Sequence, residues 1–151
     1  MKGIYDIHCH IVPGVDDGAK TLSDSMGLLD EEREQGVDAV IMTPHYGPKF
    51  GHPDKDVLRE HFDEISQKAE RYYPEISLYL GSELYYQENT ISDLDGGKAL
   101  TMNGTRYVLV EFGVKDPYTY LYRAIQSFVY AGYIPIIAHA ERYEAVFRHM
   151  D

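Results

Sequence analysis

The stretch YDIHCH at residues 5–10, followed by VDDG at residues 15–18, decides how the rest of the chain is organised. We expect a strand from Ile4 to His10. Because successive side chains of a strand point to opposite faces, His8 and His10 project to the same side. Two imidazoles placed in this way can share one metal ion. The pair alone is weak evidence, since a single histidine near a strand end is more often a hydrogen-bonded surface or core residue.

Length, composition and charge restrict the class of protein. The 151 residues correspond to one domain, and a hydrophobic content of 44% is enough to form a core. The net charge of -11 argues against nucleic-acid binding, because the 14 basic residues are scattered among 25 acidic ones. The single cysteine excludes an intramolecular disulfide. No signal peptide and no long apolar run is present, so we expect a soluble, cytoplasmic protein without membrane insertion.

Strands and helices are expected to alternate along the chain. Apolar runs bounded by turn residues predict five strands, over residues 4–10, 37–43, 76–81, 106–110 and 133–138. Apolar periodicity and capping residues predict helices over residues 21–35, 54–73 and 117–132, with another beginning near Tyr143. Between residues 84 and 104 we expect irregular structure, with a loop at residues 93–97 and a turn at Asn103-Gly104. The repeated unit is typical of βα crossovers in a parallel sheet or barrel.

Histidine and glutamate side chains recur where the predicted strands end. All five strands supply at least one member of this set, which comprises His8, His10, His45, Glu83, Glu111 and His139. The carboxyl ends of barrel strands converge and carry the active site. Glu111 also follows a buried run, where an unpartnered carboxylate is costly and a metal would neutralise it. We therefore interpret the set as one functional site, and His52, His61 and His149 as surface residues.

The ligand types point to metal chemistry. Imidazoles and carboxylates without a thiolate suit Mn²⁺, Fe²⁺ or Zn²⁺, and several shared carboxylates favour more than one ion. Arg142, close to His139, has a planar guanidinium that can grip phosphate oxygens, although a surface arginine at a helix start is an equal alternative. Cysteine-dependent phosphatases use Cys-x5-Arg, but Val15 stands six residues after Cys9. We therefore expect Cys9 to be a buried strand residue.

The motifs, taken in order, resemble one known family. They are DIHCHIVPGVDDG at residues 6–18, TPH at 43–45, GSE at 81–83, LVEF at 109–112 and AHAERY at 138–143. This combination is similar to the capsule-regulating, manganese-dependent protein-tyrosine phosphatases of bacteria, which belong to the PHP (polymerase and histidinol phosphatase) superfamily. The resemblance covers essentially the whole chain.

The resemblance implies an α/β fold, a distorted (β/α) barrel of PHP type, with two or three Mn²⁺ ions. The implied reaction is hydrolysis of phosphotyrosine in proteins by a metal-bound hydroxide, with Arg142 binding the phosphate. The implied partner is a phosphotyrosyl protein, such as a tyrosine kinase of capsule or exopolysaccharide synthesis. The ligands are divided among three ions: His8, His10 and Glu83 on the first, Glu83, Glu111 and His139 on the second, and Asp17 and His45 on the third.

The family pattern continues past residue 151 with further βα units and an Asp-x-His pair that completes the first and third metal sites. We therefore expect residues 1–151 to form a single PHP-type domain, incomplete at its C-terminus and truncated to about five βα units. Such a sheet exposes an edge and apolar surface, which a homo-oligomer can cover. Two alternatives stay open: a metal-binding or interaction module with little activity, and a phosphoesterase for a small ester such as histidinol phosphate.

Overall fold

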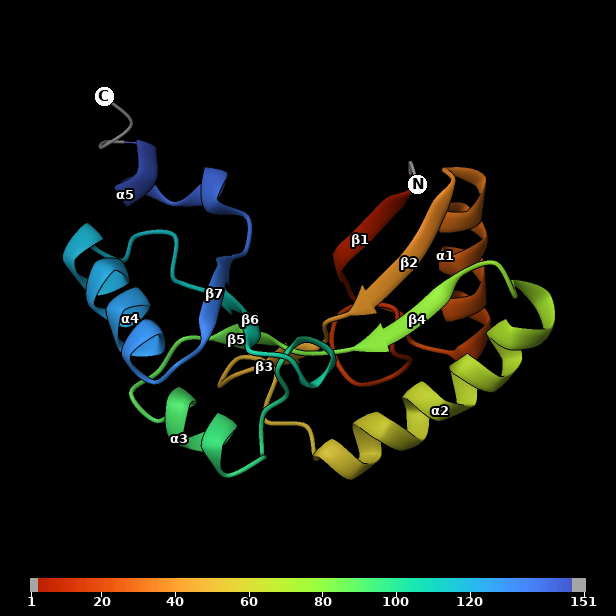
Figure 1. Ribbon diagram of the computed structural model, residues 1–151, viewed down its shortest axis with the longest axis horizontal. Coiled ribbons are helices and arrows are strands. Elements are labelled where there is room, and N and C mark those ends of the chain that lie inside the picture. The colour runs from red at the N-terminus through yellow and green to blue at the C-terminus, as the bar shows by residue number, and fades with distance from the viewer. Residues whose placement is uncertain (1–2, 148–151) are drawn as a thin grey trace.

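The computed structural model describes residues 3–147, which form an α/β structure of short parallel strands and covering helices (Figure 1). The strands are β1 (Ile4–Cys9), β2 (Val37–Met42), β3 (His45–Tyr46), β4 (Ser77–Leu80), β5 (Glu83–Tyr85), β6 (Tyr107–Glu111) and β7 (Ile134–Ile137). The α-helices are α1 (Leu22–Glu34), α2 (Lys55–Tyr72), α3 (Thr90–Asp95), α4 (Tyr118–Tyr130) and α5 (Glu144–Phe147). Short 3-10 helices lie at Met102–Gly104 and Ala140–Arg142.

The described strands form two parallel sheets. One sheet has the order β1-β2-β4, and the other has the order β3-β5-β6-β7. All of the strand pairs in both sheets are parallel. Figure 1 shows α1 and α2 beside the three-stranded sheet, and α3 and α4 beside the four-stranded sheet. The expectation of an α/β fold with parallel strands and helical crossovers is confirmed.

The sequence predicted five strands, but two more, β3 and β5, follow β2 and β4 within residues 3–147 and belong to the second sheet. The strand expected over residues 37–43 ends as β2, and the chain resumes after two residues as β3. In the same way, the strand expected over residues 76–81 is followed by β5. Backbone N–H groups of Gly81 and Glu83 donate to the carbonyls of Met42 and Pro44. These bonds hold the short β2–β3 and β4–β5 connections side by side. His45 and Glu83 therefore open strands of the second sheet, where they are paired in register.

Each sheet has its own apolar core. The first core lies between the β1-β2-β4 sheet, α1 and α2, and its fully buried members include Leu29, Val40 and Ile65. The second lies between the β3-β5-β6-β7 sheet and α4, and includes Val110 and Phe128. Helix α1 begins at a capping box, in which the Thr21 hydroxyl accepts from the backbone N–H of Asp24 and the Asp24 carboxylate accepts from the backbone N–H of Thr21.

Strand β1 lies at the edge of its sheet, with β2 as its hydrogen-bonded neighbour. On this strand, Ile4 is 55% exposed and Ile7 is 42% exposed. Large apolar side chains are normally buried in a parallel sheet, which helices cover on both faces. The exposed edge and apolar surface expected from the sequence are therefore present on β1.

Local predictions between residues 84 and 104 meet with mixed success. Helix α3 overlaps the loop expected at residues 93–97, so that prediction is wrong. A helix of six residues is too short to show a clear apolar periodicity. The turn expected at Asn103-Gly104 is confirmed, because both residues have positive φ angles, 51° and 67°. The helix expected near Tyr143 begins one residue later, as α5.

None of the helices within residues 3–147 combines the length and apolar character needed to cross a bilayer. The cytoplasmic location stays a prediction. His149 lies outside the described residues.

Candidate metal centre

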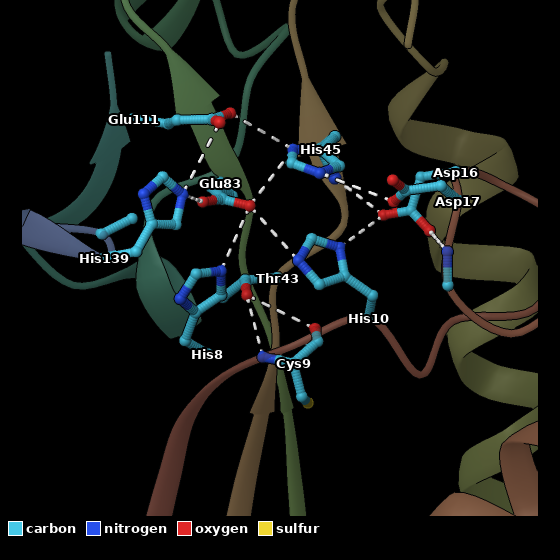
Figure 2. Close-up of polar contacts among 12 residues, drawn as sticks. His8, Cys9, His10, Asp16, Asp17, Thr43, His45, Glu83, Glu111 and His139 are labelled. Carbon is cyan, nitrogen blue, oxygen red and sulfur yellow. Dashed lines mark hydrogen bonds and ion pairs between the residues drawn. The ribbon is translucent and has the colours of Figure 1, made fainter. Parts of the chain in front are cut away.

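The predicted histidines converge on one buried carboxylate at the junction of the two sheets (Figure 2). Glu83, on β5, has a side chain that is 1% exposed. Its Oε2 lies 3.1 Å from His8 Nε2, 3.2 Å from His10 Nε2 and 3.1 Å from His45 Nδ1. Its Oε1 lies 3.0 Å from His139 Nε2. One glutamate thus contacts histidines from β1, from β3 and from the end of β7.

Two further carboxylates lie on either side of His45. Glu111, at the end of β6, places Oε2 3.6 Å from His45 Nδ1 and Oε1 3.5 Å from His139 Nε2. Asp17 Oδ1 lies 3.5 Å from His45 Nε2. These separations exceed those of ordinary hydrogen bonds, but they suit donor atoms that share one cation at about 2.0–2.2 Å each. All seven predicted ligand residues are thus brought into one cluster.

Three groups within this cluster can each offer three donor atoms lying within 4.8 Å of one another. They are His8, His10 and Glu83; His10, Asp17 and His45; and His45, Glu83 and Glu111. The first group coincides with the first ion implied by the family resemblance. The second group adds His10 to Asp17 and His45, and the third has His45 where the resemblance implied His139. His139 contacts the same two carboxylates, Glu83 and Glu111. The assignment of ligands to individual ions stays a prediction.

The side chain of His45 tests whether the cluster suits a metal ion. Its Nδ1 atom is buried and has no hydrogen-bond partner among the described residues, although it faces oxygens of Glu83 and Glu111. A buried polar atom left in this way is costly, and native structures contain few of them. A cation between the imidazole and the two carboxylates would satisfy all three groups. The residues present therefore fit a divalent metal of borderline hardness.

Asp16 orients His10 from behind. The Asp16 Oδ2 atom lies 2.7 Å from His10 Nδ1, and because a carboxylate can only accept, Nδ1 carries the proton and Nε2 is directed at Glu83. The same Asp16 oxygen accepts from the backbone N–H of His45 at 3.0 Å. Carboxylates commonly hold metal-ligating histidines in this manner. The sequence prediction selected Asp17 and missed Asp16, whose signal was the Asp-x-Gly turn ending at Gly18.

The ionisable groups of the cluster shift one another's pKa values. Burial lowers the pKa of His10, but its bonds to Asp16 and Glu83 outweigh this effect and raise the pKa to about 10. Burial alone would raise the pKa of Glu83, yet the contacts with His10 and His8 hold it well below its ordinary value. Burial and the Glu83 charge raise the pKa of Glu111. Without a metal, a proton on His10 balances Glu83, so a cation must displace that proton on binding.

Two backbone features shape the cluster. A Cβ atom at position 18 would lie 2.1 Å from the carbonyl oxygen of His10, so only glycine allows the Asp16–Gly18 turn to pack against that strand end. His139 adopts a left-handed conformation, with φ 32° and ψ 50°. Such a conformation is unfavourable for a residue with a Cβ and is often found at functional sites. It turns the chain just after β7, where the imidazole meets Glu83.

Tyr143, to which the sequence assigned no role, joins the ends of two ligand-bearing strands. Its hydroxyl donates to the carbonyl of Ala138 at 2.9 Å and accepts from the backbone N–H of Phe112 at 3.1 Å. The tyrosine is fully buried. Because Phe112 follows Glu111 and Ala138 precedes His139, this bridge links the backbone beside the two candidate ligands. The sequence offers little signal for it, since the partners are backbone groups.

Arg142, the predicted phosphate-binding residue, lies at the end of the Ala140–Arg142 turn. Its side chain is 67% exposed, and within the described residues its ion pair is with Glu141, at 3.6 Å, rather than with the cluster. Its role in binding phosphate stays a prediction.

Other predictions concerned residues outside the ligand set. Cys9 lies in β1 as expected, partly buried, and burial raises the pKa of its thiol well above the ordinary value, which disfavours a thiolate nucleophile. His61 is more than a surface residue, because its Nδ1 donates to the carbonyl of Pro13 at 2.8 Å and ties α2 to the loop before Asp16. His52 is exposed, with its ring packed edgewise on Tyr46.

A parallel α/β fold with four histidines and three carboxylates gathered at one sheet junction defines a protein class suited to binding divalent metals. Comparison with known families makes the identification specific. The family model described as "Capsular polysaccharide synthesis, CpsB/CapC" matches residues 4–151, and the chain belongs to this family.

Named relatives include tyrosine phosphatases from several bacteria. The chain is 33% identical over 143 residues to the tyrosine-protein phosphatase CpsB of Streptococcus agalactiae serotype V, covering 95% of this chain and 59% of the relative. It is 32% identical over 139 residues to the tyrosine-protein phosphatase YwqE of Bacillus subtilis strain 168, covering 92% and 55%. The chain thus spans less than two thirds of the length of these relatives.

A solved structure matches the fold as well. It comes from a study of YwqE from Bacillus subtilis and CpsB from Streptococcus pneumoniae, described as metal-dependent tyrosine phosphatases. The TM-score is 0.87 at 30% sequence identity, and the match covers 96% of this chain and 59% of that one. The described fold therefore matches the corresponding part of this solved structure.

Proposed function

We propose that the chain is the ligand-bearing part of a metal-dependent phosphatase that hydrolyses phosphotyrosine in proteins. The observation that carries the proposal is the buried Glu83 carboxylate in contact with four histidines at the sheet junction. Seven imidazole and carboxylate groups meet there, which is the ligand chemistry of two-metal phosphoester hydrolysis. The choice of phosphotyrosine as substrate follows the relatives that are named tyrosine-protein phosphatases.

The cofactor in this proposal is Mn²⁺, with Fe²⁺ and Zn²⁺ as alternatives that suit the same donors. Two or three ions are held by the predicted set, which comprises His8, His10, Asp17, His45, Glu83, Glu111 and His139. A bound divalent ion lowers the pKa of a water molecule and stabilises negative charge on phosphoryl oxygens. Asp16 keeps the proton of His10 on Nδ1, so Nε2 is available to the metal. The two oxygens of Glu83 contact different sheets, since Oε2 lies near His10 after β1 and Oε1 lies near His139 after β7.

Arg142 is the proposed phosphate-binding residue. Its exposed guanidinium lies three residues after His139 and is paired with a neighbouring exposed carboxylate. Exposed ion pairs of this kind contribute little, so exchanging Glu141 for a phosphate costs little. The planar guanidinium can then hold two phosphoryl oxygens at once.

We propose a barrel architecture and a protein partner for this chain as well. The two sheets are adjoining parts of a distorted (β/α) barrel, and a second polypeptide, such as another copy of the chain, covers the apolar edge at β1. The substrate is a phosphotyrosyl protein, for example a tyrosine kinase that acts in capsule synthesis. The family description, capsular polysaccharide synthesis, supports this assignment.

The decisive experiment measures phosphate release from a phosphotyrosyl peptide by the 151-residue chain, with Mn²⁺ and with a chelator. We expect Mn²⁺-dependent release that His139→Ala abolishes, because this imidazole contacts both Glu83 and Glu111. Glu64→Gln on the exposed face of α2 is the matched control and should retain full activity.

The alternatives predict other outcomes. Bound Mn²⁺ without turnover of any phosphate ester would show a metal-binding or interaction module. Faster hydrolysis of histidinol phosphate than of the peptide would show a small-molecule phosphoesterase.

A further inference from the structure

The loop between β3 and α2 carries an aromatic side chain onto the metal centre. The ring of Phe50 stacks on the imidazole of His45, with centroids 3.9 Å apart and planes within 4° of parallel. Gly47 and Gly51 form the base of this loop through an antiparallel bridge, with an N–H···O bond of 2.9 Å. Phe50 is therefore held at the border of the cluster, where it stays half-buried.

A second aromatic residue borders the same cluster. Tyr85 is the register partner of Glu111 in the pairing of β5 with β6, and it lies two residues after Glu83 on the same strand. Side chains two positions apart share a face, so Tyr85 projects on the face of the sheet that carries Glu83. A Cβ atom at Gly47 would lie 2.6 Å from the Cβ of Tyr85, so the base of the loop packs directly on this tyrosine. Tyr85 is half-buried, like Phe50.

We infer that Phe50 and Tyr85 are specificity-determining residues, forming the two aromatic walls that receive the ring of an aryl phosphate while its phosphoryl group lies on the cluster. The inference rests on the proposed phosphatase function and names the residues that make the site prefer aryl over alkyl esters. Aromatic rings in edge-to-face or offset contact favour one another beyond the area they bury. Each wall accounts for about a two- to tenfold preference in affinity.

Lys49 contacts the Phe50 ring when no substrate is bound. Its Nζ atom lies 4.5 Å from the centroid of the Phe50 ring. Because His45 covers one face of that ring, the ammonium lies over the other. A cation–π contact of an exposed lysine is weak, so a substrate ring can replace it. The displaced ammonium stays at the mouth as a positive charge, in a chain whose net charge is -11, and attracts the phosphate.

The inference is tested by binding rather than by turnover. Phenylphosphonate and methylphosphonate carry the same anionic group and are not hydrolysed, so calorimetry on the Mn²⁺-loaded chain compares the ring directly. We expect the wild type to bind phenylphosphonate at least about tenfold more tightly. Phe50→Leu and Tyr85→Leu should each reduce that preference about two- to tenfold, with methylphosphonate affinity unchanged within about twofold. Phe50→Tyr keeps a ring and should keep the preference.

The control and the contrary outcomes are distinct. Tyr130→Leu removes a tyrosine that is 84% exposed on α4 and should change neither affinity. A wild type that binds both phosphonates equally would overturn the inference even if a variant fails to fold. So would a loss of both affinities together in the folded Leu variants. If the wild type prefers phenylphosphonate but releases no phosphate from any ester, the aromatic walls stand and the proposed phosphatase function fails.

Discussion

The three-stranded and the four-stranded sheet differ in how they hold their share of the candidate metal centre. In the four-stranded sheet, Glu111 ends a strand in which Val108 and Val110 are fully buried. In the three-stranded sheet, His8 and His10 belong to or follow an edge strand on which Ile4 and Ile7 are exposed. Burial of the neighbouring valines positions Glu111. It cannot position His8 and His10 in the same way, because apolar neighbours on their strand are exposed.

Polar contacts replace burial at the edge strand. Asp16 fixes the ring of His10 and the backbone of His45. The backbone N–H of Cys9 donates to the Thr43 hydroxyl, and the Thr43 N–H donates to the Cys9 carbonyl at 2.8 Å. These two bonds tie the end of β1 to the connection between β2 and β3. The comparison shows that the same centre depends on packing in one sheet and on a hydrogen-bond network in the other. It predicts different consequences for substitutions on the two sides.

The largest effect is expected where both sides meet, at Glu83. Glu83→Gln keeps the shape but removes the charge of the carboxylate that contacts four histidines, and with it the shared oxygen ligand. We expect Mn²⁺-dependent phosphate release to fall by more than about 100-fold, beyond what loss of a supporting residue costs. The measurement is turnover together with bound metal. Activity within tenfold of the wild type would show that the two sheets do not share this ligand.

A smaller effect is expected for the network at the edge strand. Asp16→Asn leaves the position filled but weakens the bonds to His10 and His45, and we expect Mn²⁺ affinity to fall about 10- to 100-fold. Titration with Mn²⁺ measures this affinity. Asp63→Asn, on the exposed side of α2, is the matched control. Equal affinities of the two variants would mean that β1 is held without Asp16.

On the four-stranded sheet the matching change is Tyr143→Phe. It removes the hydroxyl that bridges Phe112 and Ala138 and leaves the buried N–H of Phe112 without its partner. We expect the free energy of unfolding to fall by about 1–3 kcal/mol. Mn²⁺ affinity should change less than in Asp16→Asn, because packing still holds Glu111. Urea unfolding and Mn²⁺ titration measure the two quantities, and a loss of affinity without a loss of stability would contradict the comparison.

A dependence on pH is expected in the metal-free protein, in which no cation displaces the proton on His10. The pKa of His10 is raised from 6.5 to about 10, so its stabilising contribution is complete below 6.5 and is lost as pH rises through 10. The pKa of Glu83 is held below its ordinary 4.5, so its contribution is present above 4.5 and is lost as pH falls further. With a chelator present, the urea midpoint should therefore be higher at about pH 6 than at about pH 9.5. Asp16→Asn should reduce the difference, and a midpoint that rises with pH would refute this coupling.

Sequence reasoning selected candidate ligands that the structure brings together, because strand ends are easy to locate. A polar residue directly after an apolar run is visible in the sequence, and parallel strands bring such positions to one edge. His10 follows this rule, as does Glu111, whereas His8 lies within β1 and was selected because it shares a face with His10. The rule says nothing of Asp16, Phe50 or Tyr143, which reach the cluster through a turn, a loop hairpin and a backbone bridge.

The sequence by itself determined the parallel α/β class, the seven candidate ligands and the family, because alternating apolar runs and short motifs are local properties. Only the tertiary structure decided that the chain continues after β2 and β4 into two further strands of a second sheet, and that Glu83 lies among four histidines. It also decided that His139 is left-handed. These features depend on contacts between residues far apart in the chain. The energies of such contacts cannot be deduced from a local sequence pattern.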